Sequence, residues 1–498
     1  MAERQELAGW RWGPFTFRVP FYHTRLCWSE FLQGLLVSAA TGLALIPVMT
    51  AYFGLSFEEA VALSMVHAFL IASAVIIFGE PYAGGWITPA LPLILAFVIG
   101  GYEDPSSRFQ AMTALSLVFA LLVFILGITG LGRRFVIWLP DTLKAGIILG
   151  AAIAALKRVF IDDAERFLLE QPIATTLACA ICLIFTFSVP MQKLKARNRF
   201  FFMVGALGLL PGFLIAAMVG PFVGEVSFDI QWGFVVPPFA EAFAKASPLV
   251  NGWPSMEMIA QSIPLALIAY IILFGDIVTG NEVLRDGMQT RIDEHIDINL
   301  NRTHFSLSIR NALMGIFAPF FPTQGAVWTG VHVIVVQRWK QGPQAMGSLH
   351  SGLASYYLMG LPFIYFLLPL LTGLKPLLGI ALSLTLVLTG FACAYIAMSI
   401  PRDNASRGTV VLIGAALAFF EPWIGLLIGV VATLVMVGWD RSPDPIPHDW
   451  HGGNERDGHG HPSDVFGCAS VVLVQPDKSK QGHIRAINNP VRGDSNGR

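Results

Sequence analysis

Long apolar runs, repeated along most of the chain, are the feature that most limits what this sequence can fold into. A helix that crosses the hydrocarbon core of a bilayer needs about 20 predominantly apolar residues. The clear runs lie near residues 31–53, 60–78, 110–131, 173–190, 201–219, 258–279, 352–372, 376–398 and 422–438. Shorter or interrupted runs lie near residues 87–100, 143–156, 306–321, 326–337 and 408–420. Together they predict an all-α, multi-pass membrane protein with about fourteen transmembrane segments.

The composition excludes most soluble functions. Only 13% of the 498 residues are charged, whereas about 25% are charged in an ordinary soluble domain. The formal net charge of −1 gives no field that would attract a nucleic acid, so we expect no such partner. Cys179 and Cys182 lie one helical turn apart without further zinc ligands, and we therefore expect neither a metal nor a cofactor. The basic N-terminal stretch has no apolar core followed by a cleavage site, so no removable signal peptide is predicted.

Basic residues in the connections predict the orientation of the chain. Cytoplasmic loops of membrane proteins are enriched in Lys and Arg. The connections after even-numbered runs carry most of these residues, for example around 133–134, 193–199 and 285–302. The connection after the fifth run, with Lys157, Arg158 and Arg166, is an exception. The balance predicts that both termini are cytoplasmic, that the protein lies in a bacterial-type inner (plasma) membrane, and that residues 221–257 form an external loop.

Two short segments unlike the rest of the chain indicate an internal repeat. Residues 82–92, which directly follow Pro81, and residues 321–331 each start in a stretch with Pro and Gly, pass through a Trp and a Thr, and continue as an apolar half-length helix. Each belongs to the third run of a set of seven. Residues 139–150 and 371–382 match in the same way as fifth runs. Because seven is odd, the second half would enter the membrane with the opposite orientation, which predicts a 7+7 inverted repeat whose third and tenth spans are discontinuous.

The two broken spans predict a binding site near the middle of the membrane. Extended backbone at membrane depth must be buried in protein or line a cavity, because its polar groups find no partners in lipid. The half-helices begin near Thr88 and Thr329, which are expected to cap them, and their amide ends would favour a partly negative ligand. Ordinary Pro/Gly kinks are the alternative interpretation. The predicted substrate-binding residues are Trp86, Ile87, Thr88, Gly325, Val327, Trp328 and Thr329, together with Asp276.

Asp276 is the acidic residue that stands out within an apolar run. It follows about twelve uncharged residues, and a charge at the centre of a span costs about 2.5–3.5 kcal/mol. We therefore expect Asp276 to face the interior of the protein and to exchange a proton or bind a cation. With Thr279 and Asn281 it is the predicted site for a coupling H+ or Na+. The alternative is a hydrated structural carboxylate, since Glu282 and Arg285 follow soon after.

These residues resemble a known family. Residues 286–338, which include Arg310-Asn-Ala-Leu-Met-Gly-Ile-Phe-Ala-Pro, resemble the ninth-to-tenth-span signature of nucleobase–ascorbate (xanthine, uracil or vitamin C) permeases, and residues 139–150 resemble their fifth span. Sulfate permeases and bicarbonate exchangers are similar in architecture. The resemblance implies a core domain and a gate domain that move against each other like an elevator, and a homodimer formed through the gate domains. It also implies that Asp276 matches the acid of span eight that binds substrate or a coupling ion.

The resemblance divides the chain into a cytoplasmic N-terminus, two interleaved halves of each domain, an external loop and a cytoplasmic tail. In chain order these segments are 1–27, 28–139 (core, spans 1–4), 140–220 (gate, spans 5–7), 221–257, 258–372 (core, spans 8–11), 373–440 (gate, spans 12–14) and 441–498. The sequence departs from the nucleobase pattern at 326–329, where a second acid is missing, and at Gly280, where a polar residue is usual.

We therefore expect a secondary active transporter of the elevator type, and not an enzyme. It would move a small polar or anionic solute across the bilayer by symport with H+ or Na+. A sulfate- or bicarbonate-like anion exchanger and a passive anion channel on the same fold are the alternatives.

Overall fold

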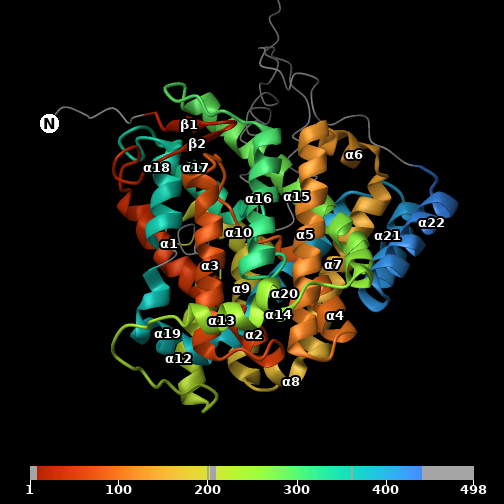
Figure 1. The fold of residues 1–498 in the computed structure, drawn as a ribbon, viewed down its shortest axis with the longest axis horizontal. Coiled ribbons are helices and arrows are strands. Elements are labelled where there is room, and N and C mark those ends of the chain that lie inside the picture. Colours follow the sequence, from red (N-terminus) through yellow and green to blue (C-terminus); the bar gives the residue numbers. More distant parts are fainter. Residues whose placement is uncertain (1–7, 199–200, 202–208, 361–362, 440–498) are drawn as a thin grey trace, which may run out of the picture.

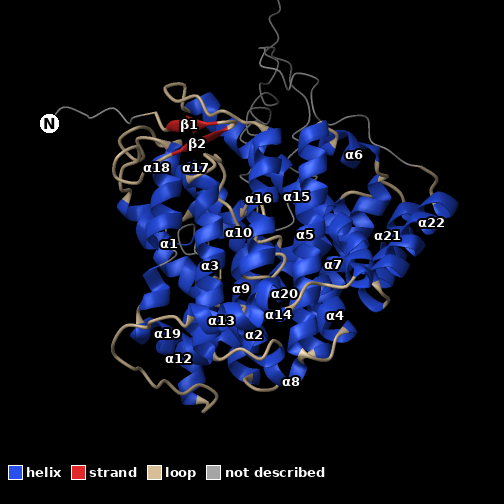
Figure 2. Cartoon of the chain, viewed as in Figure 1, coloured by secondary structure: helices blue, strands red, loops and turns tan. Residues whose placement is uncertain are grey.

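The computed structural model describes residues 8–198, 201, 209–360 and 363–439. In this part of the chain almost all regular structure is helical (Figure 2). The elements of the first half are β1 (Trp10–Trp12), β2 (Phe15–Phe17), α1 (Trp28–Thr41), α2 (Ile46–Tyr52), α3 (Phe57–Ile76), η1 (Thr88–Ala90), α4 (Leu91–Gly101), α5 (Pro105–Thr129), α6 (Gly132–Trp138), α7 (Asp141–Lys157), η2 (Arg158–Asp162), α8 (Ala164–Phe167), α9 (Pro172–Phe187), α10 (Val189–Arg197) and α12 (Leu210–Phe222). The predicted cytoplasmic tail, 441–498, lies outside the described residues.

The second half begins with two short helices and the longest helix of the described chain. Its elements are α13 (Phe239–Ala246), α14 (Pro248–Asn251), α15 (Met256–Thr290), α16 (Leu300–Phe317), α17 (Thr329–Trp339), α18 (Leu349–Ala354), η3 (Ser355–Gly360), η4 (Phe363–Phe366), α19 (Leu368–Leu374), η5 (Lys375–Leu377), α20 (Leu378–Ser399), α21 (Asn404–Phe419) and α22 (Pro422–Met436).

Several helices are long and apolar enough to cross a membrane, which makes this a multi-pass membrane protein. Within the described residues, four helices have this length and composition, namely Phe57–Ile76, Pro105–Thr129, Met256–Thr290 and Leu368–Ser399. A fifth is added if Pro172–Phe187 and Val189–Lys195, which are bent by 60°, form one span. Shorter apolar helices cover Thr88–Gly101, Leu210–Phe222, Asn404–Phe419 and Pro422–Met436. The count of about fourteen spans stays a prediction, because many of the apolar runs form helices that are too short to cross a bilayer by themselves.

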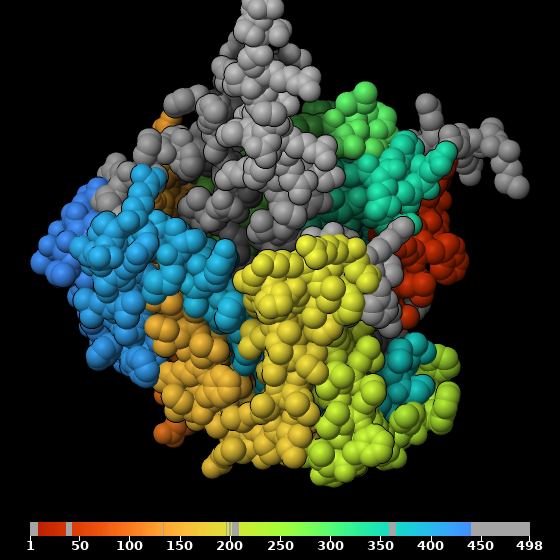
Figure 3. Space-filling view, turned by 180° about the vertical axis from the view of Figure 1, so that it is seen from behind, coloured from red at the N-terminus to blue at the C-terminus, as the bar shows by residue number. Residues whose placement is uncertain are grey.

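The helices pack in two groups. Helix α5 packs against α15 and α16, whereas α7 packs against α20 and α21 (Figure 1). Seen from behind, α9, α10 and α12 form the middle of the molecular face, with α21 to one side (Figure 3). The hairpin β1–β2 lies at one end of the bundle, and α8, α12 and the loop before α13 lie at the opposite end (Figure 1). The domain boundaries drawn from the sequence stay predictions.

Polar residues at the helix starts explain where the long helices begin. Ser56 and Glu59 form a reciprocal capping box at the start of α3, with hydrogen bonds of 3.1 and 2.7 Å. Asp104 accepts a hydrogen bond from the amide of Ser107 at the start of α5, and Asp403 caps α21 in the same way. Such caps satisfy amides that have no partner within the helix.

The N-terminal segment contains a β-hairpin that the all-helical prediction missed. Strand β1 pairs antiparallel with β2, and Trp12 lies opposite Phe15. The hairpin binds the end of α3, because Trp12 Nε1 donates to the carbonyl of Ile77 (2.8 Å) and the amide of Arg18 donates to the carbonyl of Ile76 (2.8 Å). These bonds satisfy carbonyls that a helix end leaves unpaired. The sequence signal was the alternation in 10–17 around Gly13 and Pro14.

Candidate functional site

The two segments that the sequence singles out lie side by side as paired extended chains. Residues 78–87 precede η1, and residues 318–328 precede α17. Three backbone hydrogen bonds connect the segments: from the amide of Ile87 to the carbonyl of Pro322 (3.0 Å), from Gly325 to Gly85 (2.6 Å) and from Trp328 to Ala83 (2.6 Å). The partners run in opposite directions along the chain, so the pairing is antiparallel. Backbone groups that lipid could not satisfy are therefore satisfied between the two segments.

Two glycines make this close pairing possible. A Cβ atom at Gly85 would lie 2.5 Å from Cβ of Trp328, and one at Gly325 would lie 2.7 Å from the carbonyl oxygen of Gly85. Both distances are shorter than a van der Waals contact. Any larger residue at either position would push the segments apart.

Both half-helices begin without a side-chain cap. The capping positions are Ile87 and Trp328, neither of which offers a side-chain acceptor. Thr88 and Thr329 are the first helical residues, so the expectation that these threonines cap the helices is wrong. The first amides of an uncapped helix point outward with partial positive charge. The hydroxyl of Thr329 is also buried without a hydrogen-bond partner, so this helix start holds a polar group that no described residue satisfies.

The predicted lining residues divide into an accessible and a buried set. Ile87, Gly325, Val327 and Thr329 are buried. The accessible set is half-buried and consists of Trp86, Thr88 and Trp328. Turn η1 lies against α15 and also against α7 and α20 of the other helix group. The paired segments therefore lie where the two groups of helices meet.

Asp276 is buried on the face of α15 that meets the second broken segment. Its relative exposure is 1%, and its Oδ1 atom has no hydrogen-bond partner. Among the described residues no ion pair reaches it. One turn further along the same face, a Cβ at Gly280 would contact the side chains of Val327 (3.0 Å) and Tyr82 (3.4 Å). A buried carboxylate without a partner is costly, so it takes up a proton or binds a cation.

The structure places the other two predicted coupling-ion ligands differently. The hydroxyl of Thr279 donates to the carbonyl of Gly275 within α15 (3.0 Å). Asn281 lies about 140° around the helix from Asp276, and its Oδ1 accepts a hydrogen bond from the hydroxyl of Tyr82. Asn281 therefore attaches α15 to the first extended segment, and no described contact brings it to Asp276.

His332 connects three elements of the site. Its Nδ1 accepts from the amide of Ala83 (3.3 Å), and its Nε2 lies 3.2 Å from the carbonyl of Gly280. The two contacts together place the proton on Nε2. This imidazole on α17 thus holds both the first extended segment and α15.

Sequence reasoning missed the buried polar residues behind the second segment. Arg310 and Asn311 on α16 are buried and bind the backbone of Gly325 (3.2 Å) and Gln324 (2.9 Å), respectively. Gln324 in turn donates to the carbonyl of His67 (3.2 Å). The available signal was the Arg-Asn pair, in which Asn311 lies thirteen residues before Gln324. The sequence does not show that these side chains point toward that segment.

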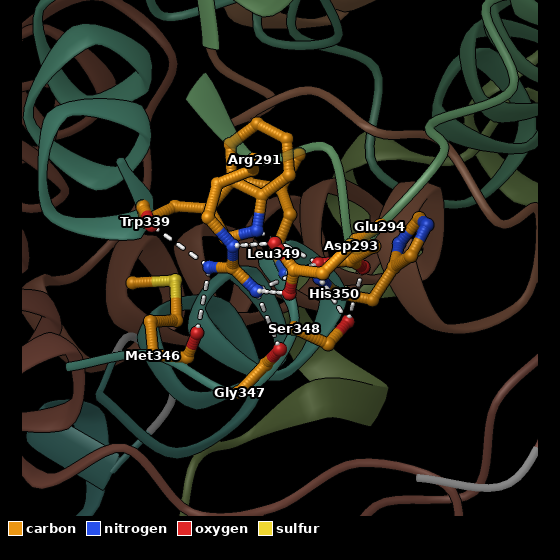
Figure 4. Close-up of polar contacts among 9 residues, drawn as sticks. All are labelled: Arg291, Asp293, Glu294, Trp339, Met346, Gly347, Ser348, Leu349 and His350. Atoms are coloured by element: carbon orange, nitrogen blue, oxygen red, sulfur yellow. Dashed lines mark hydrogen bonds and ion pairs between the residues drawn. The ribbon is translucent and has the colours of Figure 1, made fainter. Parts of the chain in front are cut away.

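A second polar cluster fixes the far ends of α15 and α17 (Figure 4). Arg291, which follows α15, donates to the carbonyls of Trp339 (2.8 Å) and Met346 (2.9 Å). Glu294 accepts hydrogen bonds from Trp339 Nε1 (2.7 Å) and the hydroxyl of Ser348 (2.7 Å). We name the cluster around Arg291 and Glu294 the loop clamp. The loop clamp connects the end of α15, which carries Asp276, to the end of α17, which carries Thr329. It therefore limits how far the two helices can slide along each other.

Comparison with known proteins gives only distant structural similarity. No protein-family profile and no curated protein matches the sequence. The structure is similar to that of SLC26A9 with a TM-score of 0.48, 16% identity and coverage of 82% of this chain and 65% of that chain. It is also similar to the transmembrane domain of the cyanobacterial bicarbonate transporter BicA (TM-score 0.45, 14% identity, 81% and 97% covered). A third is the murine Slc26a9 anion transporter in the inward-facing state (0.46, 14%, 84% and 69%).

The chain spans 65% of the length of the SLC26A9 chain to which it is similar. The resemblance to nucleobase–ascorbate permeases is not confirmed by these structures.

Proposed function

We propose that this protein is a secondary active transporter that moves a small anion across the membrane together with H+ or Na+. The single observation that carries the proposal is the arrangement around Asp276. Two uncapped helix starts are paired through their extended segments, and both pack against α15, the helix that carries a buried carboxylate with no ion-pair partner among the described residues. The helix starts favour an anion, and the carboxylate favours a cation or proton.

The negative charges of the anion and of ionised Asp276 explain why the anion would be transported together with H+ or Na+. An anion at the amides of α17 is destabilised by an ionised Asp276 nearby, since like charges repel strongly where water is scarce. A proton or Na+ at Asp276 removes that repulsion. Each solute thereby raises the affinity of the site for the other, which is the thermodynamic basis of symport.

Movement of one helix group against the other would give alternating access. Turn η1 lies against α7 and α20, so the site is at the boundary between the two groups. We propose that the group around α5, α15 and α16 carries the solute past the group around α7, α20 and α21. We further propose a homodimer through the latter group, with both termini in the cytoplasm.

The second candidate function is an anion exchanger or a passive anion channel. The uncapped helix starts favour an anion in either case. The discriminating property is dependence on a cation gradient, which a symporter has and which an exchanger or a channel lacks.

Transport by purified protein in proteoliposomes tests the proposal. The tested solutes would be bicarbonate, sulfate, chloride and succinate, each with imposed pH or Na+ gradients. We expect uptake of at least one anion that is driven by one of the gradients, and loss of that response in Asp276→Asn. Glu282→Gln is the matched control, because Glu282 lies on the same helix but is partly exposed and paired with Arg285 (3.3 Å).

Uptake by the wild type that ignores both gradients would favour the exchanger or the channel. An unchanged gradient response in Asp276→Asn would contradict the role of this carboxylate. Transport of none of the four anions would contradict the proposed function itself.

A further inference from the structure

We propose that Arg310 determines the charge selectivity of this transporter, by placing a buried positive charge directly behind the second broken segment. The inference rests on the proposed function, and it names the residue that makes the site prefer an anion. No basic residue occurs within 321–331 itself, so a positive charge for the site has to come from another element.

The guanidinium group of Arg310 is buried, and its hydrogen-bond partners among the described residues are all neutral groups. Its relative exposure is 1%. It donates to the hydroxyl of Ser306 (3.3 Å), to the side-chain oxygen of Gln324 (3.3 Å) and to the carbonyl of Gly325 (3.2 Å). Each of the three guanidinium nitrogens thus has one acceptor, but none of these acceptors neutralises the charge.

The nearest acidic partner is already shared. The acid that interacts electrostatically with Arg310 is Glu80. Glu80 also lies 3.4 Å from Arg302 and accepts a hydrogen bond from Thr303 (2.7 Å). The other acid paired with Arg302 is Asp297, whose side chain is 72% exposed and therefore screened by water. Two buried arginines thus share one buried carboxylate, and the region keeps a positive excess.

The excess positive charge would act on an anion bound at the second broken segment, next to the start of α17. A buried charge is poorly screened and interacts over several ångströms. The carbonyl of Gly325 that binds Arg310 belongs to the same peptide group as the amide of Ala326, and the hydrogen bond polarises that amide into a stronger donor. The Ala326 amide forms no hydrogen bond within the described residues. The start of α17, three residues further on, carries the buried and unpaired hydroxyl of Thr329.

A purely structural role for Arg310 is the competing explanation, and Asn311 provides the means to separate the two. Asn311 is the next residue on α16, is also buried, and holds the same segment through a hydrogen bond to the carbonyl of Gln324 (2.9 Å). It does so without a charge. If Arg310 only holds the segment in place, removal of either the Arg310 or the Asn311 side chain should lower the affinity for the anion to the same extent.

The experiment compares four variants in detergent and in proteoliposomes, with sulfate, bicarbonate and neutral uracil as probes. Arg310→Gln removes the charge and keeps donors, Arg310→Lys keeps the charge, Asn311→Ala removes only an anchor, and Glu80→Gln removes the opposing charge. We expect Arg310→Gln to raise the KM or Kd of the preferred anion about ten-fold or more, and Arg310→Lys to restore most of the affinity. Glu80→Gln should lower the same constant. Asn311→Ala should lower the melting temperature without changing the preference for the anion over uracil.

Equal losses of anion affinity in Arg310→Gln and Asn311→Ala would overturn the proposal, as would a change of less than two-fold in folded Arg310→Gln. If Arg310→Gln does not fold, the Glu80→Gln variant decides, because a weaker or unchanged anion affinity there contradicts the inference. The protein could also bind an anion in a way that depends on Arg310 and yet transport none of the probes. That result would refute the proposed function but support the role of Arg310 in anion selectivity. Absence of anion binding by the wild type would end both proposals.

Discussion

The amide of Gly325 donates a 2.6 Å hydrogen bond to the carbonyl oxygen of Gly85. This bond joins the second broken segment to the first, and it requires that both residues lack a side chain. The site is thus built on contact between two backbones, and the side chains that could bind a solute are placed by that contact.

The paired glycines should be intolerant of a single methyl group. We expect Gly85→Ala to abolish transport and to destabilise the fold, since its Cβ would lie 2.5 Å from Cβ of Trp328 and overpacking costs about 1–3 kcal/mol. Gly84→Ala is the matched control, because its Cβ would meet Ile71 at an ordinary 3.5 Å. Thermal unfolding in detergent and solute uptake are the measurements. Similar behaviour of the two variants would show that the close pairing is not required.

The two threonines should differ in their access to water. Thr88 is half-buried, whereas Thr329 has a relative exposure of 0%. We expect Thr88→Cys to react with a small aqueous thiol reagent and to be protected by the transported anion. Thr329→Cys should react much more slowly. Mass spectrometry of the labelled protein gives both rates, and rapid labelling of position 329 would contradict the described packing.

Asp163 should act as a latch between the two helix groups. It accepts a hydrogen bond from the hydroxyl of Tyr52, and it pairs with Arg158 at 2.5 Å. Tyr52 ends α2 in the predicted core domain, whereas Arg158 follows α7 in the predicted gate domain. The bond would therefore join segments that separate in an elevator movement. Removal of one partner of a buried ion pair is strongly destabilising, by about 3–5 kcal/mol. We expect Asp163→Asn to increase the fraction of molecules in which α2 has separated from the segment that follows α7.

The neighbouring residue provides the control for the latch. Asp162 pairs with Lys157 at 2.7 Å within the same turn, and both side chains are partly exposed. Such a pair contributes at most about 1 kcal/mol, so Asp162→Asn should leave the population unchanged. Hydrogen exchange of residues 46–52 in lipid nanodiscs reports the opening. Equal exchange in the two variants would argue against a latch at Asp163.

The loop clamp should make stability depend on pH. Burial raises the pKa of Glu294, although hydrogen bonds from Ser348 and Trp339 oppose the shift. A group whose pKa is raised in the folded state stabilises it below the ordinary pKa, and this stabilisation is lost as the pH rises through the raised value. The melting temperature of the wild type minus that of Glu294→Gln should therefore fall between pH 4 and pH 8.

Asp293 should change the stability with pH in the opposite direction to Glu294, because its pKa is shifted the other way. A hydrogen bond from Arg291 holds the pKa of Asp293 below its usual value. Its stabilisation is present above the ordinary pKa and is lost as the pH falls. The melting temperature of the wild type minus that of Asp293→Asn should therefore rise with pH below about pH 4, near the ordinary pKa of an aspartate, and stay constant at higher pH. Two differences that change with pH in the same direction would contradict both assignments.

The sequence predicted the broken segments because local chemistry specifies them. Pro, Gly and a Trp-Thr step at 82–92 and 321–331 interrupt apolar runs, and both segments are extended before a short helix. Burial of Asp276 was also expected from the cost of a charge in an apolar span. These inferences needed only the residues near each position, and for that reason a single sequence could support them.

The failures have a different origin. Capping by Thr88 and Thr329 was wrong by one residue, because the close pairing keeps Ile87 and Trp328 extended up to the capping position. Asn281 was grouped with Asp276 by sequence proximity, although its partner Tyr82 is 199 residues away in the chain. The role of Arg310 was missed because two of its acceptors, Gln324 and Gly325, lie on another element. Contacts between distant residues depend on packing, which the pattern of one helix does not contain.

The antiparallel crossing of the two segments has a consequence for how the protein is made. The ribosome completes residues 83–87 more than two hundred residues before it reaches 322–328. Until then the carbonyls of Ala83 and Gly85 have no partners from the second half, and the first half must wait in the membrane with part of its backbone unsatisfied. Neither half expressed alone should hold a solute, whereas the two halves produced as separate chains in one cell have all the groups needed to rebuild the crossing.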